Sequence, residues 1–252
     1  MIKSAIKKIL RAFDYDIIKG RTYFYDFYPD TTDLEQKIIN DAREFTITSV
    51  RRLESLVRTV KYIKDNAVPG AIVECGVWKG GSIITAANMC YALGEMTREF
   101  YLFDTFAGMT EPSVHDEQYV HDEYNKKKTD DGFSTWCRVS QQDVRSNIQK
   151  ACKLPIEKFH FVEGPVEKTL DAPENIPDQI AVLRLDTDWY ESTMKEMEVL
   201  FPRVVKNGVV IIDDYGHLQG ARKAVDEYLK RMGITPLIYS VDMSCRSFVK
   251  TH

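Results

Sequence analysis

The stretch Ile72–Thr85 reads IVECGVWKGGSIIT, and it decides the fold. The apolar run Ala71–Val73 is rich in β-branched residues and predicts a short buried strand that ends in the acid Glu74. Three glycines follow, and apolar residues then recur at helical spacing. A strand, a glycine turn and a helix in this order form a ligand cradle, because glycine lets the backbone approach closely and a helix start presents free N–H groups.

The glycine spacing fits neither of two common phosphate cradles. A P-loop requires Lys and then Ser or Thr after its last glycine, whereas here Lys79 precedes the last two glycines, and the dinucleotide fingerprint G-x-G-x-x-G is missing. The carboxylate of Glu74 suits a ligand with a cationic end, such as the ammonium of S-adenosylmethionine. Gly76 and Ser82 of the same turn are further candidates for that site. The alternative interpretation is that these glycines only form the turn between the strand and the helix and bind no ligand.

Length and composition indicate one α/β domain with appendages. The chain has 252 residues, 44% of them apolar, and its net charge of −4 gives no general affinity for nucleic acid. No apolar run approaches the ~20 residues of a membrane span, and lysines interrupt the first residues, so we expect neither a span nor a signal peptide. Five cysteines at no ligand spacing indicate free thiols in a reducing cytoplasm.

The N-terminal part, residues 1–66, is expected to form a helical extension that covers the ligand cradle and mediates homo-oligomer contacts. Residues 67–252 then form the catalytic domain. An amphipathic pattern over 2–13 is typical of a helix docked on the body or on a second subunit. The alternative is a helix on an anionic membrane surface. The aromatic cluster at 23–28 indicates packing or a subunit interface.

Helical spacing continues over residues 33–66, before Pro69 and Gly70 break the chain. Its second half presents an apolar face made of Leu53, Leu56, Val57, Val60 and Ile63. Thr46 or Thr48 is expected to cap this helix.

Further apolar runs predict the remaining strands, the last two as an edge hairpin. They are Phe100–Phe103, Phe159–Val162, Ile180–Leu185, Val209–Ile212, Leu237–Tyr239 and Arg246–Val249. In an open α/β sheet, ligands bind beyond the carboxyl ends of the strands. Asp104 ends the second strand and is expected to accept hydrogen bonds from ribose hydroxyls, with capping as the alternative. Glu163 ends the third strand and is a candidate contact for adenine. The alternative is that it only marks the start of a loop.

Residues 105–136 are polar and show no clear periodicity. A long irregular segment in a compact domain is either disordered or functional. This segment leaves a strand end where a ligand is expected, and it carries Phe106, Met109, His115 and Trp136. We therefore expect a mobile lid over the substrate.

Acids follow two strands that we expect to be neighbours. Asp186 and Asp188 follow one, and Asp213 and Asp214 follow the other. Four like charges at one edge repel each other and are costly to desolvate, and a hard cation resolves this conflict. Oxygen ligands favour Mg²⁺, or Mn²⁺ and Ca²⁺, over zinc. Asp186, Asp213 and Asp214 are the expected metal ligands, and Asp188 the expected base; His217 is the alternative base.

The two expected sites together suggest methyl transfer to a hydroxyl. A metal orients a substrate hydroxyl pair and lowers its pKa, and a nearby carboxylate takes the proton. The oxygen then attacks the donor methyl group in line, and alignment in a site closed by the lid supplies most of the rate.

Four motifs in this order resemble the macrocin O-methyltransferase family. They are VECGVWKGG (73–81), FDTFAGM (103–109), LRLDTDWYEST (183–193) and IIDDYGHLQGARKAVDEY (211–228). The resemblance spans residues 46–228. It implies an S-adenosylmethionine- and metal-dependent enzyme that methylates sugar hydroxyls of antibiotics. A surface-polysaccharide precursor or a nucleotide sugar is an equally open acceptor.

The resemblance also implies a fold and residue roles. The fold is the Rossmann-like class I methyltransferase fold, a mostly parallel seven-stranded sheet with a reversed last strand and helices on both faces. The residues matching the expected metal ligands hold Mg²⁺, and the one matching Asp188 acts as base. Glu74, Gly76 and Asp104 match donor-site residues, and Thr48 is placed near the donor's carboxylate. Members are often dimers or larger.

Two other functions stay open at this point. One is a nicotinamide-dependent reductase on a doubly wound fold, which the missing G-x-G-x-x-G and the lack of a Tyr-x-x-x-Lys pair beside a serine oppose. The other is a non-catalytic binding module, which the four mutually repelling aspartates oppose.

Overall fold

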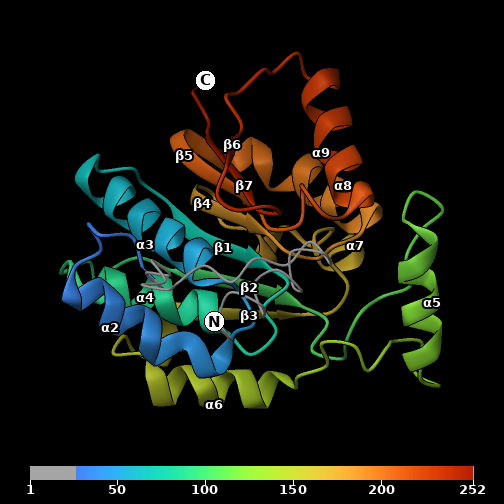
Figure 1. Cartoon of the computed structure of the whole chain (residues 1–252), viewed down its shortest axis with the longest axis horizontal. Helices are drawn as coiled ribbons and strands as arrows, with labels where there is room; N and C mark the ends of the chain where they lie inside the picture. The colour runs from blue at the N-terminus through green and yellow to red at the C-terminus, as the bar shows by residue number, and fades with distance from the viewer. Residues whose placement is uncertain (1–26, 252) are drawn as a thin grey trace, which may run out of the picture.

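The computed structural model describes residues 27–251, and one seven-stranded sheet runs through it (Figure 1). Its strands are β1 (Ala71–Cys75), β2 (Phe100–Asp104), β3 (Phe159–Glu163), β4 (Ile180–Leu185), β5 (Val204–Ile212), β6 (Tyr239–Ser240) and β7 (Arg246–Val249). Their order across the sheet is β3-β2-β1-β4-β5-β7-β6. The first five strands pair in parallel, and β7 pairs antiparallel with β5 and β6. The predicted fold class, with its reversed strand, is confirmed.

Helices cover both faces of the sheet, with α2, α3, α4 and α6 on one face and α7, α8 and α9 on the other (Figure 1). They are α2 (Asp33–Ala42), α3 (Val50–Asp65), α4 (Gly81–Ala92), α5 (Gln118–Lys127), α6 (Gln141–Ala151), α7 (Val166–Thr169), α8 (Tyr190–Val199) and α9 (Gln219–Arg231). Short 3₁₀ turns are η1 (Arg43–Phe45), η2 (Ile156–Lys158), η3 (Pro173–Asn175) and η4 (Phe201–Arg203). Every residue of β1 and β4 is buried, as expected for parallel strands covered on both faces.

The two N-terminal helices pack on the same apolar core as the sheet. Thr32 and Glu35 form a reciprocal capping box at the start of α2. At the start of α3 the hydroxyl of Ser49 accepts the N–H of Arg52, whereas Thr46 accepts the N–H of Thr48. The prediction that Thr46 or Thr48 caps this helix is therefore wrong, because the helix begins at Val50, directly after Ser49 and later than either threonine would place it. The expected apolar face of α3 is buried against α4.

The segment 105–136 is more ordered than its sequence suggests. It contains α5, which stands beyond the carboxyl ends of the strands (Figure 1), and a bridge pairs Lys128 with Ser134. The expectation of a fully irregular segment is thus corrected. Periodicity missed α5 because only Val120 and Tyr124 are buried along its length.

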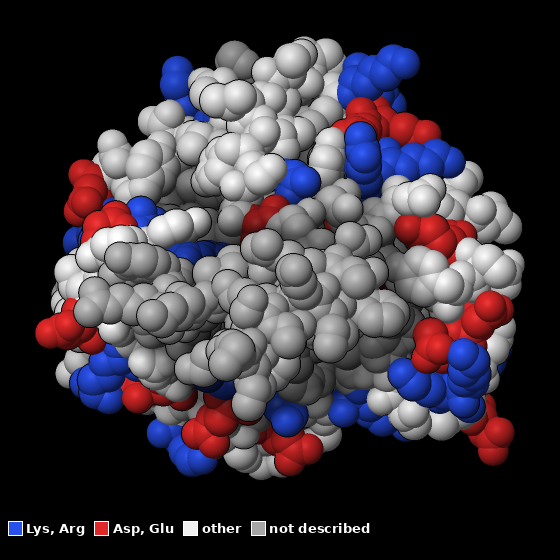
Figure 2. Space-filling view, in the orientation of Figure 1, with Lys and Arg blue, Asp and Glu red and all other residues white. Residues whose placement is uncertain are grey.

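The expected helix at 2–13 and the first three members of the aromatic cluster lie outside the described residues. Of the cluster's later members, Phe27 packs against the core, and Tyr28 lies under the guanidinium of Arg51, 3.8 Å from the ring centroid. Between residues 27 and 251, no helix has both the length and the apolar character that crossing a membrane requires. On the described part of the face in Figure 2, acidic and basic side chains are interspersed.

Candidate active site

A cavity of about 350 Å³ lies beyond the carboxyl ends of the central strands. Its walls come from the loops after β1, β2, β3, β4 and β5, from the start of α3 and from the segment 105–136. Ligands of open α/β sheets bind at this edge. The structure brings nearly all of the predicted site residues to this one cavity: Thr48, Glu74, Gly76, Ser82, Asp104, Asp186, Asp188, Asp213 and Asp214.

Glu163 is the predicted site residue that the cavity does not include. Its side chain is exposed, and its carboxylate accepts a hydrogen bond from Gln141 at 3.2 Å. The next residues, Gly164 and Pro165, line the cavity in its place, together with Glu167. The adenine contact predicted for Glu163 therefore has no support from the geometry, because the strand ends with this side chain pointing toward α6.

The glycine turn after β1 fits closely against β4. Gly76 has φ of +83°, and a Cβ there would lie 2.0 Å from the carbonyl oxygen of Asp186. Asp104 braces the turn from β2, since one carboxylate oxygen accepts the N–H groups of Val77 at 2.7 Å and Trp78 at 3.1 Å. The other oxygen accepts the N–H of Phe106 at 2.8 Å. These are the contacts of the capping alternative, and the ribose contact of Asp104 stays a prediction.

Glu74 presents a buried carboxylate to the cavity. It is only 2% exposed, and one of its oxygens lies 2.7 Å from Arg184. The other oxygen has no hydrogen-bond partner among the described residues. Burial raises the pKa of Glu74 to about 7, against the opposing effect of the Arg184 charge. A buried acid with a free oxygen fits a cationic group such as the ammonium predicted here.

Arg184 is a buried cation that sequence reasoning missed. Besides Glu74, its guanidinium contacts Asp186 at 2.6 Å and Asp213 at 2.5 Å. It lies in β4, where every neighbour in the strand is buried. The signal was available, because a single charge within an apolar strand has to be paired to be tolerated. Arg184 thus links the predicted donor acid to the acids of two neighbouring strand ends.

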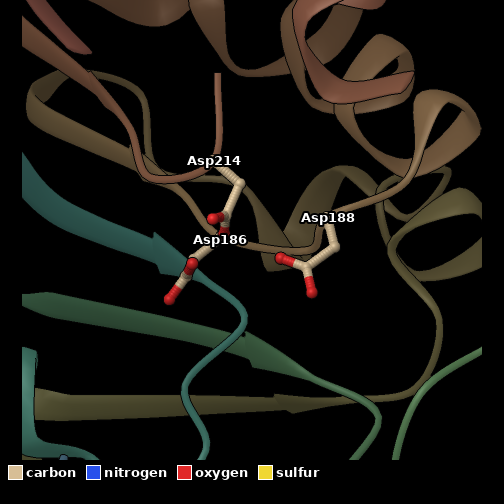
Figure 3. A group of neighbouring side chains, drawn as sticks. All are labelled: Asp186, Asp188 and Asp214. Atoms are coloured by element: carbon tan, nitrogen blue, oxygen red, sulfur yellow. The ribbon is translucent and has the colours of Figure 1, made fainter. Parts of the chain in front are cut away.

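Three carboxylates form a compact group beyond β4 and β5 (Figure 3). Asp186, Asp188 and Asp214 each offer one oxygen, and these oxygens lie within 4.8 Å of one another. Burial and the neighbouring carboxylates raise the pKa values of Asp186 and Asp188 well above the usual range. A divalent cation with a preference for oxygen ligands would relieve this repulsion, so the donor set fits such an ion.

Asp213 stands apart from this group. One oxygen binds Arg184, and the other binds Arg52 at the start of α3. The compact group thus contains three of the four predicted aspartates, whereas Asp213 is paired with two arginines, and its role as a metal ligand stays a prediction. Arg52 also binds Asp242, in the turn between β6 and β7, at 2.8 Å.

Asp188 has an unusual backbone conformation. Its φ is +74°, and the N–H of Trp189 donates to the carbonyl of Thr187 at 2.9 Å. These features define a γ-turn of the rare form whose central residue has φ near about +75°. Such backbone strain costs about 1–3 kcal/mol and persists only where the surroundings enforce it.

The residues after Asp188 fasten this turn. Trp189 is 2% exposed, its indole N–H donates to the carbonyl of Thr110 at 3.0 Å, and its ring meets the Trp136 ring edge-on. Trp189 is therefore a core residue. The hydroxyl of Tyr190 donates to Glu227 at 2.7 Å.

His217 lies at the mouth of the cavity. Its ring nitrogen is 3.5 Å from the hydroxyl of Tyr119, which α5 contributes. The segment 105–136 thus reaches across the cavity to the loop after β5. This position is compatible with a substrate contact, and the role of His217 as alternative base stays a prediction.

Comparisons with known proteins agree with this geometry. The family profile described as Macrocin-O-methyltransferase (TylF) matches residues 32–250. The chain is 32% identical over 240 residues to 8-demethyl-8-(2,3-dimethoxy-alpha-L-rhamnosyl)-tetracenomycin-C 4'-O-methyltransferase of Streptomyces olivaceus, covering 94% of this chain and 87% of the relative. It is also 32% identical to demethyldecarbamoylnovobiocin O-methyltransferase of Streptomyces niveus, covering 82% and 78%.

A solved structure shows the same architecture. The O-methyltransferase NovP superposes with a TM-score of 0.73 at 29% sequence identity, covering 86% of this chain and 88% of NovP. Between the two enzyme functions left open by the sequence, these likenesses favour methyl transfer over hydride transfer.

Proposed function

This chain belongs to the macrocin O-methyltransferase family, and we propose on that basis that it transfers a methyl group from S-adenosylmethionine to a sugar hydroxyl with the aid of Mg²⁺. The observation that carries the proposal is the placement of two sites in one cavity. The buried acid Glu74 and its glycine turn form one, and the group of Asp186, Asp188 and Asp214 forms the other.

The donor site would be formed by Glu74, Gly76, Ser82 and Thr48, with Asp104 bracing the turn. When bound, S-adenosylmethionine supplies an electrophilic methyl group. The free oxygen of Glu74 would accept a hydrogen bond from the donor's ammonium, which favours the charged carboxylate. Gly76 keeps the backbone close to β4, so that this acid lies beside the acids of the next strand end.

Asp186 and Asp214 would hold the metal, and Asp213 stays a predicted ligand. A bound Mg²⁺ would orient the acceptor hydroxyls and lower their pKa; Mn²⁺ or Ca²⁺ suits the same oxygen ligands. The hydroxyl of Ser244 donates to Asp214 at 3.0 Å and so orients one of these carboxylates. Arg184 likewise orients the carboxylate of Asp186 through its contact at 2.6 Å.

Asp188 would act as the general base. Its carboxylate oxygen takes the proton from the acceptor hydroxyl, and its raised pKa makes it a stronger base than an ordinary aspartate. The segment 105–136 lines the cavity with Trp136 and contacts His217 through Tyr119, and on this proposal it would exclude water while the acceptor is bound.

The acceptor would be a glycosylated natural product. This assignment rests on the two relatives, one of which is named for methylation of a rhamnosyl tetracenomycin and the other for a novobiocin precursor. A nucleotide sugar or a surface-polysaccharide precursor is the competing acceptor class. A homo-oligomer is also part of the proposal, because the N-terminal aromatic cluster favours a subunit interface.

Calorimetry and turnover test the proposal in sequence. We expect saturable binding of S-adenosylmethionine, Mg²⁺-dependent methylation of a glycoside, and loss of turnover in Asp186→Asn and Asp188→Asn with donor binding retained. Asp226→Asn, on the exposed face of α9, is the matched control. Absence of donor binding would refute the proposal. Donor binding without turnover on any acceptor class would favour a non-catalytic module.

A further inference from the structure

A buried acid lies beneath the turn that presents Asp188, outside the cavity. Glu196 of α8 is 0% exposed, and one of its carboxylate oxygens accepts the hydroxyl of Thr187 at 2.9 Å. Thr187 is the residue between Asp186 and Asp188, and its carbonyl closes the γ-turn on the N–H of Trp189. The side chain of Glu196 is therefore hydrogen-bonded to Thr187, the residue directly before Asp188, whose φ is positive.

Packing alone gives no reason for an acid at this place. On the same helix, Thr193 and Met197 are buried against the body, and an apolar side chain would fill the position of Glu196 without a desolvation cost. Burial raises the pKa of Glu196 well above its usual range, which the hydrogen bond from Thr187 only partly opposes. A buried acid that costs stability and touches the reaction loop indicates a role in that loop.

We propose that Glu196 is a positioning residue, which holds Thr187 so that the γ-turn presents Asp188 to the acceptor hydroxyl. The inference rests on the proposed function, since it assigns Asp188 as base. Hydrogen bonds fasten the residues on either side of Asp188 in the chain. Thr187 before it donates to Glu196, and the indole of Trp189 after it donates to the carbonyl of Thr110. Without the contact to Glu196 the chain would relax from a positive φ at Asp188, and the carboxylate would move.

Isosteric variants test this link. Thr187→Val removes the hydroxyl, Glu196→Met removes the acceptor at similar volume, and Glu196→Gln keeps an acceptor oxygen. We expect the first two to lower kcat at least about 10-fold, since misplacement by about 1 Å costs up to about 100-fold. KM for the glycoside and Kd for S-adenosylmethionine should stay within about 2-fold. Glu196→Gln should restore most of kcat.

A double variant and a matched control separate positioning from stability. The double variant Thr187→Val with Glu196→Met should have a kcat no lower than that of the slower single variant. The reason is that the two substitutions remove the same hydrogen bond. Glu54→Met, which removes another buried glutamate in α3, should lower Tm and leave kcat unchanged. Glu196→Met should instead keep or raise Tm while kcat falls. Additive losses, equal losses in Glu196→Gln and Glu196→Met, or unchanged kcat would overturn the inference.

A readout other than activity distinguishes this inference from the proposed function. A crystal structure of Thr187→Val should show residue 188 with a changed φ and its carboxylate displaced from Asp214. An unmoved turn would refute the positioning role even in an active enzyme. If the wild-type protein does not bind S-adenosylmethionine and the Asp188→Asn variant keeps its turnover, the proposed function fails. That outcome is independent of the conformation of the turn.

Discussion

Arg184 is the residue on which both predicted sites depend. Its buried guanidinium contacts Glu74, Asp186 and Asp213, and these come from three adjacent strands. Removing one partner of a buried ionic network leaves uncompensated charge, which costs far more than losing a surface pair. The buried charge of Arg184 thus offsets part of the negative charge that these three carboxylates bring to the cavity.

Arg184→Met should lower the free energy of unfolding by about 3–5 kcal/mol at pH 7. The loss should be smaller at pH 5, because Glu74 and Asp186, whose pKa values are raised by burial, then take up protons. Urea unfolding at both pH values measures it. Lys37→Met is the control, since Lys37 pairs with Asp41 on an exposed helix face, and its effect should stay within about 0.5 kcal/mol. Equal effects of the two variants would contradict the network.

Gly76→Ala tests the close fit of the donor turn. The new methyl group would overlap the carbonyl oxygen of Asp186, and the residue would keep a positive φ. Gly94→Ala has a similar φ of +70° with no atom within 4 Å, so it reports the backbone cost alone. We expect Gly76→Ala to be less stable than Gly94→Ala by at least about 2 kcal/mol in urea unfolding. A smaller difference would show that the backbone at Asp186 shifts readily to make room for the added methyl group.

At the scale of elements, the segment 105–136 is held over the cavity by a few specific contacts. Asp116 is buried, and it accepts the N–H of Tyr190 at the start of α8 at 2.9 Å and the N–H of Ser113 at 2.7 Å. Glu117 accepts the N–H of Gln219 at the start of α9 at 2.8 Å. This segment is thus fastened to the starts of two helices on one face of the sheet.

Asp116→Ala should loosen the segment 105–136 without unfolding the sheet. The N–H of Tyr190 would lose its partner, so the amides of α5 should exchange at least about 10-fold faster by hydrogen–deuterium exchange, while those of β1 and β4 stay protected. Asp130→Ala, an exposed acid of the same segment, is the control. If α5 exchanges at the wild-type rate in Asp116→Ala, the segment 105–136 is held by its aromatic contacts instead.

For the whole molecule, one set of ion pairs joins three distant parts of the chain. Arg52 at the start of α3 binds Asp213 at the end of β5 and Asp242 between β6 and β7. Ser49 also donates to Asp242 at 2.9 Å. The cap of α3, the reversed strand and one wall of the cavity therefore meet at Asp242.

The pKa of Asp242 is lowered to about 2 from the usual 3.8, by backbone N–H groups and by Arg52, although burial opposes them. A lowered carboxyl pKa adds stability that is present above pH 3.8 and is lost as the pH falls toward about 2. Asp242→Asn should therefore be less stable by about 1 kcal/mol at pH 6. Its deficit in urea unfolding should shrink from pH 4 downward. Asp178→Asn, fully exposed, should show no such trend.

By itself, the sequence determined the order of the strands and of most helices, the glycine turn after β1 and the presence of acids at the ends of the first five strands. Such features are local, because β-branched runs, glycines and residues that follow a strand act within a few positions of the chain. The motifs also pointed to the family that the profile match then showed.

Only the tertiary structure decided which charges meet. It paired Asp213 with Arg52 and Arg184, left Asp186, Asp188 and Asp214 as a group, turned Glu163 away and placed Glu196 under Thr187. None of these partners could be assigned from spacing. The reason is physical: a charge is satisfied by whatever lies within a few ångströms, and sheet order and helix packing bring residues that are far apart in the chain to that distance.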